Sequence, residues 1–147
     1  MIIRRLLPVV AMVGGLLAAC STQPTAPAAN SVPGVPVSVE GGTYANITPA
    51  ELVEMLKNKD FLFVNTHVPY EGEIEQTDAL IAFNETGPQR VNDYPADKSA
   101  KIVLYCRSGR MSSIVAQELV KAGYTNVWNL DDGMIAWEKA GYELTGK

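Results

Sequence analysis

Apolar residues from residue 42 onwards follow two patterns that alternate along the chain. Short runs of four or five mostly apolar residues have the length of strands that are buried on both faces. Between these runs, apolar residues recur at the spacing of one helix face. Strands are therefore predicted at Phe61–Val64, Ala79–Phe83, Lys101–Tyr105 and Val127–Leu130.

A first helix is predicted directly after Thr48. This residue is followed by Pro49 and then by Glu51, which is the order of an N-cap, a first-turn proline and a capping box. The apolar face of this helix is predicted to consist of Leu52, Val53 and Leu56.

Two further helices are predicted in the second half of the chain. Ser112 or Ser113 is placed to cap the first of them, and Gly123 is placed to end it. Its predicted apolar face contains Val115, Leu119 and Ala122. The second is a short helix over Gly133–Ala140.

Strands that alternate with helices predict an α/β domain in three layers, with a central parallel sheet and helices on both faces. We place this domain at residues 42–147. The polar stretch Asn84–Ser99, which contains two prolines, is expected to cross the surface as a long connection.

The first twenty residues have the character of an export signal. Met1–Arg5 is positively charged, and Leu6–Ala19 is apolar but too short to span a bilayer comfortably. Leu17–Cys20 resembles a bacterial lipobox, in which the signal peptide (residues 1–19) is removed and Cys20 receives a lipid. The resemblance implies an exported protein anchored to a bacterial membrane. The alternative is an ordinary signal peptide or a weak anchor, with a cysteine there by chance.

The residue after Cys20 bears on which membrane is implied. In lipoproteins of this kind, a residue other than Asp at this position accompanies transfer to the outer membrane, and here it is Ser21. The expected location is therefore the outer membrane, facing the periplasm. Residues 20–41 are rich in Pro and Ala and are expected to be an extended tether without a site of their own.

Composition and charge narrow the possible functions. The chain is 47% apolar and 19% charged, as is usual for a globular protein, and its formal net charge is −4. Removal of residues 1–19, whose only charged residues are Arg4 and Arg5, would make this charge −6. So acidic a protein would be repelled by phosphates, and we expect no nucleic-acid partner.

The chemistry is expected at Cys106, which ends the strongest predicted strand. Ligands of parallel sheets bind beyond the carboxyl ends of strands, where loops lead into helix N-termini. Such an N-terminus favours a thiolate, as do the nearby guanidinium groups of Arg107 and Arg110. Gly109 permits a tight turn that aims several N–H groups at one centre, which would form a cradle for an anion.

Cys106 and the nearby serines also have purely structural interpretations. An isolated cysteine is often an inert core residue. The arginines that flank Cys106 make an apolar environment unfavourable. Lipidation of Cys20 would also leave Cys106 without a disulfide partner, so we favour the interpretation of Cys106 as a nucleophile. Ser108 and Ser112 would either donate to the sulfur or a bound anion, or act only as caps.

The segment Cys106–Ser112 resembles the active-site loop of single-domain rhodaneses, which are thiosulfate sulfurtransferases. Two later segments are also similar to the family. Ala122–Leu130 looks like the strand that precedes its final helix, and Asp132–Trp137 resembles its Gly-Gly…Ala-Trp signature, with Asp132 replacing the first glycine. The resemblance covers about 100 residues and implies a rhodanese-like fold.

The resemblance implies a ping-pong reaction without a cofactor or metal. Cys106 would take the outer sulfur of a small anionic donor such as thiosulfate, become a persulfide, and pass the sulfur to a thiol or protein acceptor. The implied substrate-binding residues are Arg107, Ser108, Gly109, Arg110, Met111 and Ser112. A phosphatase or an arsenate reductase is a further possibility, because these enzymes are related to rhodaneses. Their loop has one more residue than the six residues Cys106–Met111, so this possibility is the least favoured.

Parts of the chain depart from the family pattern. Val64–His67 stands where many members have Asp-Val-Arg, so Asn65 replaces the aspartate. Asn65 is expected to form a hydrogen bond with the neighbouring loop. Met111 stands where many members have Arg or Thr. These departures favour a second hypothesis, a persulfide carrier or sulfur-sensing module without efficient turnover.

The lone His67 is expected to be structural or exposed, and Glu71, Glu73, Glu75 and Asp78 to be a solvated face. Trp128 and Trp137 are expected in the core.

Overall fold

The computed structural model describes residues 33–147. The signal peptide expected at residues 1–19, the lipid expected on Cys20 and the first part of the tether lie outside the described residues. Within the described part, no helix has both the length and the apolar character needed to cross a bilayer.

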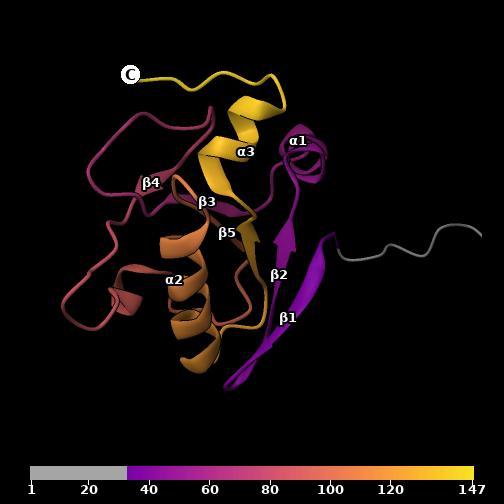
Figure 1. Cartoon of the computed structure of the whole chain (residues 1–147). Coiled ribbons are helices and arrows are strands. Elements are labelled where there is room, and N and C mark those ends of the chain that lie inside the picture. Colours follow the sequence, from indigo (N-terminus) through magenta and orange to yellow (C-terminus); the bar gives the residue numbers. More distant parts are fainter. Residues whose placement is uncertain (1–32) are drawn as a thin grey trace, which may run out of the picture. The chain divides into compact units, whose positions relative to one another are not determined.

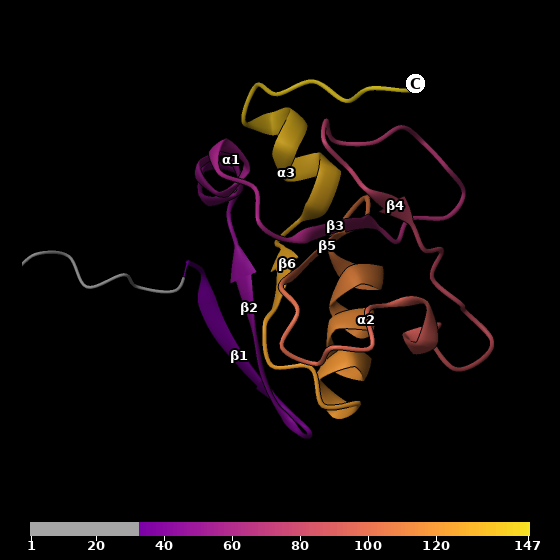
Figure 2. The ribbon, with the colours of Figure 1, turned by 180° about the vertical axis from the view of Figure 1, so that it is seen from behind.

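The described chain forms one sheet with helices on both faces (Figures 1 and 2). Five strands are mutually parallel, and the sixth, β1, runs antiparallel to its neighbour at one edge. In the order in which they lie side by side, the strands are β1 (Val35–Val39), β2 (Gly42–Ile47), β6 (Val127–Leu130), β5 (Ile102–Tyr105), β3 (Leu62–Asn65) and β4 (Ala79–Leu80). The helices are α1 (Pro49–Lys57), α2 (Arg110–Lys121) and α3 (Gly133–Lys139). The predicted three-layer α/β architecture is confirmed.

The alternation of side chains along the strands divides the core into two halves. On β5, Ile102 and Leu104 pack with α2, whereas Val103 and Tyr105 pack on the opposite face with α1 and α3. All four side chains are fully buried, as expected for a central parallel strand. Trp128 and Trp137 belong to the second half of the core, as predicted.

Helix α1 begins with the predicted capping box. The Thr48 hydroxyl accepts a hydrogen bond from the Glu51 backbone N–H at 3.3 Å, and the Glu51 carboxylate accepts one from the Thr48 N–H at 2.8 Å. The bond from the Thr48 N–H to the carboxylate is the main cause that holds the pKa of Glu51 below its ordinary value.

The tether predicted to reach residue 41 ends earlier, because part of it is strand β1. This strand pairs with β2 from Val35 opposite Asn46 to Val39 opposite Gly42, and Val37 and Val39 pack against the α2 side of the core. Proline-rich chain prefers extended conformations, and an edge strand accepts such a chain when apolar side chains alternate. The folded domain therefore starts before residue 42.

Helix α2 begins earlier than predicted. Its N-cap is Gly109, in the left-handed region at φ 77°, and neither Ser112 nor Ser113 caps it. Both serines lie in the first turn, where their hydroxyls donate to the carbonyls of Gly109 (3.2 Å) and Arg110 (2.8 Å). Only a residue that adopts positive φ easily can start the helix so soon after the strand.

Two smaller expectations are also refined. The strand predicted over Ala79–Phe83 shortens to the two residues of β4. The connection Asn84–Ser99 crosses the surface and carries a short 3₁₀ helix, Val91–Asp93, after which Tyr94 enters the core.

Candidate functional site

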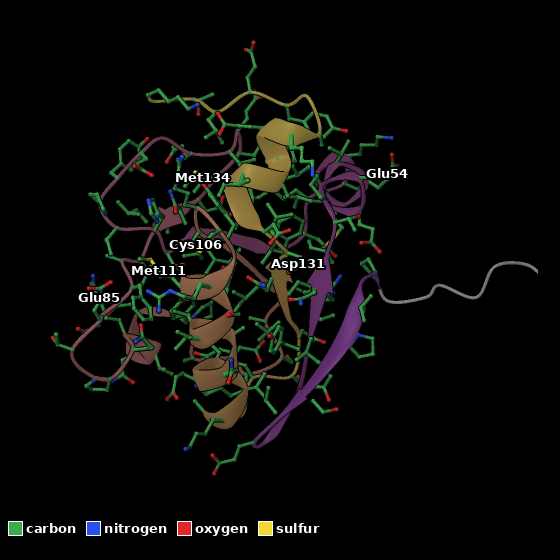
Figure 3. The ribbon with its side chains drawn as sticks, in the orientation of Figure 1. Glu54, Glu85, Cys106, Met111, Asp131 and Met134 are labelled. Carbon is green, nitrogen blue, oxygen red and sulfur yellow. The ribbon has the colours of Figure 1, made fainter. Side chains whose placement is uncertain are left out.

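Cys106 follows β5 at the carboxyl edge of the sheet, where the loops after β3, β5 and β6 meet. It is the one cysteine within residues 33–147, and its thiol is free. The residue is 1% exposed, so the sulfur lies at the base of its loop rather than on its rim. Figure 3 shows Cys106 and Met111 beside the upper end of α2.

The loop that follows Cys106 presents a series of unpaired N–H groups. Within the described chain, the N–H groups of residues 107–112 have no acceptor, and the first to donate is that of Ser113, to Gly109 O at 3.0 Å. Gly109 makes the turn possible and is itself buried, and a Cβ atom there would lie 3.0 Å from Asp132 N. Together with the N-terminus of the twelve-residue α2, these groups form a concentration of partial positive charge next to Cys106.

The start of α3 fixes the orientation of this loop. Met134 N donates to Cys106 O at 2.9 Å, and Ile135 N donates to Arg107 O at 3.0 Å. In a trans peptide the carbonyl and the following N–H point in opposite directions. The N–H groups of Arg107 and Ser108 are therefore turned away from α3 and towards the inside of the loop.

The remaining predicted binding residues occupy different depths. Arg107, Ser108 and Arg110 are exposed, and Met111 is half-buried. Ser112 is fully buried, and its hydroxyl proton is engaged by Gly109 O, which is the arrangement expected of a helix-start residue. The loop therefore places two guanidinium groups at the rim of the site and the thiol at its base.

The loop after β3 packs against the base of Cys106. Thr66 donates to Tyr105 O through both its N–H (2.8 Å) and its hydroxyl (3.1 Å). Asn65 was expected to bond the neighbouring loop, but its amide bonds its own loop instead. Its Oδ1 accepts from His67 N at 2.9 Å and its Nδ2 donates to Gly72 O at 3.2 Å.

His67, Glu71 and Arg107 form a connected group at the edge of the site. His67 Nε2 lies 2.9 Å from Glu71 Oε2, and Arg107 Nη1 lies 3.1 Å from the same oxygen. The hydrogen bond to His67 is the main cause that holds the pKa of Glu71 below its ordinary value, and the charge of Arg107 acts in the same direction. His67 itself is buried, at 7% exposure.

The sequence pattern does not predict this group. The sequence predicts that Glu71 is part of a solvated acidic face, but it pairs with Arg107 of the cysteine loop. The available signal was the four-residue spacing from His67 to Glu71, in a loop that follows a strand next to β5.

Asp78 also departs from the expected solvated face. Its carboxylate accepts hydrogen bonds from Lys59 Nζ (2.6 Å) and from the backbone N–H of Phe63 (2.8 Å), and it thereby ties β4 to β3. Among residues 33–147, no group of three or more His, Cys, Asp or Glu side chains is placed to hold a metal ion.

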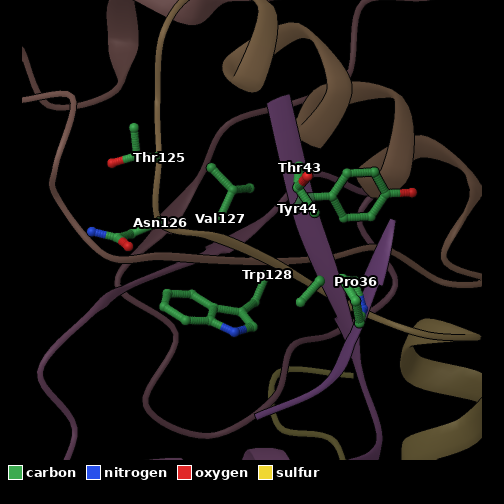
Figure 4. Close-up of a pocket in the computed structure, with 8 residues that line it drawn as sticks. Pro36, Thr43, Tyr44, Thr125, Asn126, Val127 and Trp128 are labelled. Atoms are coloured by element: carbon green, nitrogen blue, oxygen red, sulfur yellow. The ribbon is translucent and has the colours of Figure 1, made fainter. Parts of the chain in front are cut away.

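A pocket of about 230 Å³ lies away from this site (Figure 4). It is lined by the first residues of β6 and by part of β1 and β2, including Pro36, Tyr44 and Trp128. These residues mark the amino end of β6, whereas Cys106 lies beyond the carboxyl end of the parallel neighbour β5. The pocket is therefore not part of the cysteine site.

Comparison with known proteins points to one family. A family model described as a rhodanese-like domain matches residues 48–140. A sulfurtransferase from Allochromatium vinosum is 37% identical over 89 residues, which are 58% of this chain and 79% of that protein. A tRNA uridine(34) hydroxylase from Hamiltonella defensa is 33% identical over 92 residues, but these cover 59% of this chain and 26% of the hydroxylase.

Solved structures of rhodanese-like proteins have a fold similar to that of this chain. A rhodanese-like domain protein from Staphylococcus aureus superimposes with a TM-score of 0.53 at 28% identity, over 69% of this chain and 98% of that one. The matched family model spans more than half of the chain and includes both the cysteine loop and α3. This protein therefore belongs to the rhodanese-like family.

Proposed function

We propose that this protein is a sulfurtransferase that carries sulfane sulfur as a persulfide on Cys106. The observation that supports this most directly is the position of Cys106 at the base of a loop whose N–H groups, from residue 107 to 112, have no acceptor in the described chain. A persulfide anion formed on the thiol would lie among these donors, which stabilise negative charge without rearrangement. Sulfurtransferase activity in a relative at 37% identity agrees with the proposal.

The proposed reaction has two steps. With thiosulfate as donor, the Cys106 thiolate attacks the outer sulfur, the S–S bond of thiosulfate breaks, and sulfite departs with the bonding electron pair. Cys106 is left as a persulfide anion. In the second step a nucleophilic acceptor, such as a thiolate or cyanide, attacks the outer sulfur of the persulfide and releases the Cys106 thiolate.

Sulfur loading tests the proposal. The full-length chain, kept soluble in mild detergent, is incubated with thiosulfate or with a thiol persulfide, and its intact mass is measured. We expect one added sulfur atom in the native protein and none in Cys106→Ser. Cyanide should then remove the sulfur as thiocyanate. If neither donor loads Cys106, the sulfurtransferase proposal is wrong.

A persulfide carrier without efficient turnover is the second candidate. Two observations favour it: Cys106 is almost fully buried, and Arg107 is already paired with Glu71. A carrier would show the added sulfur by mass but would release thiocyanate no faster than a single loading event allows. Repeated turnover would exclude this candidate.

We also propose, from the sequence of residues 1–20, that the protein is exported and anchored to the bacterial outer membrane by a lipid on Cys20. In Cys20→Ala the precursor should keep its signal peptide or appear in the soluble fraction. A Cys20→Ala protein that is processed and membrane-bound like the native one would contradict the anchor.

A further inference from the structure

Each arginine of the cysteine loop faces a glutamate. Arg107 Nη1 lies 3.1 Å from Glu71 Oε2, and Arg110 Nη2 lies 3.9 Å from Glu85 Oε1. The two glutamates come from the connections before and after β4, so neither is a sequence neighbour of the arginine that it faces. The charge of Arg107 is thereby partly neutralised, whereas the exposed Arg110 and Glu85 form only a long and weak pair.

Further acidic residues lie on the same edge of the sheet. Asp131 and Asp132 follow β6 and are exposed, and Asp132 N would be 3.0 Å from a Cβ atom at Gly109. Figure 3 shows Asp131 and Glu85 on opposite sides of Cys106. The acidic side chains on this edge oppose the attraction that Arg107 and Arg110 exert on dianions.

The pair formed by Glu71 and Arg107 is anchored on a buried group. An ion pair between two exposed side chains is usually weak and mobile. Here the same Glu71 oxygen also bonds His67 Nε2 at 2.9 Å, and His67 is buried and has its backbone N–H bonded to Asn65 Oδ1. Glu71 is therefore held in place from the protein side, and Arg107 is held through it.

These contacts matter for the choice of sulfur donor. Thiosulfate carries two negative charges and leaves as dianionic sulfite, so free guanidinium groups favour its binding. A low-molecular-weight thiol persulfide, R–S–SH, carries at most one charge on its sulfur atoms and leaves as a singly charged thiolate.

We infer that Glu71, positioned by His67, is a specificity-determining residue that disfavours dianionic donors and directs Cys106 towards low-molecular-weight thiol persulfides. This inference rests on the proposed sulfurtransferase function. In the step concerned, the Cys106 thiolate attacks the outer sulfur of R–S–SH, a Cys106 S–S bond forms, the donor S–S bond breaks, and R–S⁻ leaves with the electron pair. The proton stays on the transferred sulfur.

A donor comparison tests the inference on the full-length chain. The rates of Cys106 loading are measured with thiosulfate and with cysteine persulfide, whose ammonium and carboxylate charges cancel. In Glu71→Gln the ratio of kcat/KM for thiosulfate to that for cysteine persulfide should rise about tenfold at low salt, mainly through a lower KM for thiosulfate. The increase should shrink as salt is added.

Glu54→Gln is the matched control. Glu54 pairs with Lys57 on α1 at 2.6 Å and lies far from Cys106 in Figure 3, so this variant loses the same charge without touching the site. Its donor ratio should equal that of the native protein. An equal ratio in native protein, Glu71→Gln and Glu54→Gln would overturn the inference, whereas failure of both donors to load Cys106 would overturn the proposed function instead.

His67 acts through Glu71, so its role is one of positioning. His67→Phe removes the bond to Glu71 and should raise the same donor ratio, although less than Glu71→Gln does. A variant that was merely less stable would lower kcat with both donors alike and leave the ratio unchanged. An unchanged ratio in a folded His67→Phe protein would remove His67 from the inference.

Discussion

Met134 N donates a hydrogen bond of 2.9 Å to Cys106 O, and this bond joins the start of the last helix to the residue proposed as nucleophile. The approach requires Gly133, which has φ 54° and would place a Cβ atom 2.1 Å from Cys106 O. The sequence around α3 thus contributes to the site through backbone contact, without any reactive side chain.

Gly133→Ala should lower the free energy of unfolding by about 3 kcal/mol or more, because the new Cβ atom forces α3 away from Cys106. Loading of sulfur on Cys106 should fall with it. Urea unfolding of the purified full-length chain measures the first effect, and intact mass measures the second.

Gly123→Ala is the control for Gly133→Ala. Gly123 also has positive φ (95°), but a Cβ atom there meets nothing within 4 Å. Only backbone strain of about 1–2 kcal/mol is expected, with sulfur loading retained. Equal losses of stability in both variants would show that contact with Cys106 is not what requires glycine at residue 133.

Tyr105→Phe should destabilise the fold by about 1–3 kcal/mol near neutral pH. The buried Tyr105 hydroxyl accepts a hydrogen bond from Ile74 N at 3.0 Å and lies 2.7 Å from the Thr77 hydroxyl. Phenylalanine would leave the Ile74 N–H buried without this acceptor. Denaturant unfolding at pH 7 measures the loss, and a value near zero would mean that the loop relaxes to find another acceptor.

The same substitution should show a defined pH dependence. Burial raises the pKa of Tyr105 to about 12, above the ordinary value of 10. Between these values the unfolded chain releases the phenol proton while the folded chain keeps it, so this group costs native stability about 1.4 kcal/mol per pH unit as pH rises. The stability gap between native protein and Tyr105→Phe should narrow from pH 10 to 12; a constant gap would contradict the assignment.

Asn65→Asp restores the residue that many rhodaneses carry, yet it should destabilise this protein by about 1–3 kcal/mol at pH 7. The buried Asn65 Nδ2 donates to Gly72 O, and a carboxylate would place negative charge against that carbonyl. Lowering the pH should recover part of the loss, because a protonated carboxyl group can donate again. Thermal unfolding at pH 7 and pH 4.5 checks both statements.

Removal of residues 1–40 should reduce stability by several kcal/mol relative to removal of residues 1–32. The shorter protein loses β1, the apolar contacts of Val37 and Val39, and the 3.0 Å hydrogen bonds from Trp128 Nε1 to Pro33 O and from Gly34 N to Glu51 Oε1. Equal melting temperatures for the two truncations would mean that β1 contributes nothing to the fold.

The sequence allowed most of the architecture to be predicted because local patterns determine it. Apolar runs matched the central strands β3, β5 and β6, and the Thr48–Glu51 capping box marked the start of α1. The loop after Cys106 was also recognisable, since its residues are contiguous. Strands β1 and β2 were not predicted, and β1 was missed because prolines suit a tether and an edge strand alike.

The group formed by His67, Glu71 and Arg107 could not be predicted in the same way. Glu71 and Arg107 belong to loops after different strands and are 36 positions apart in the sequence. Periodicity places strands side by side, but it does not specify the path of the loops that follow them. The first residue of α2 was not predicted for a related reason, because it depends on the backbone conformation of Gly109.

The two edges of the sheet affect how this domain meets other molecules. Pro36 on β1 has no N–H to offer an incoming strand, and β4 at the opposite edge extends over only two residues. Neither edge presents the long row of free donors and acceptors on which one chain templates the extension of another. Aggregation by edge-to-edge strand pairing is thereby discouraged.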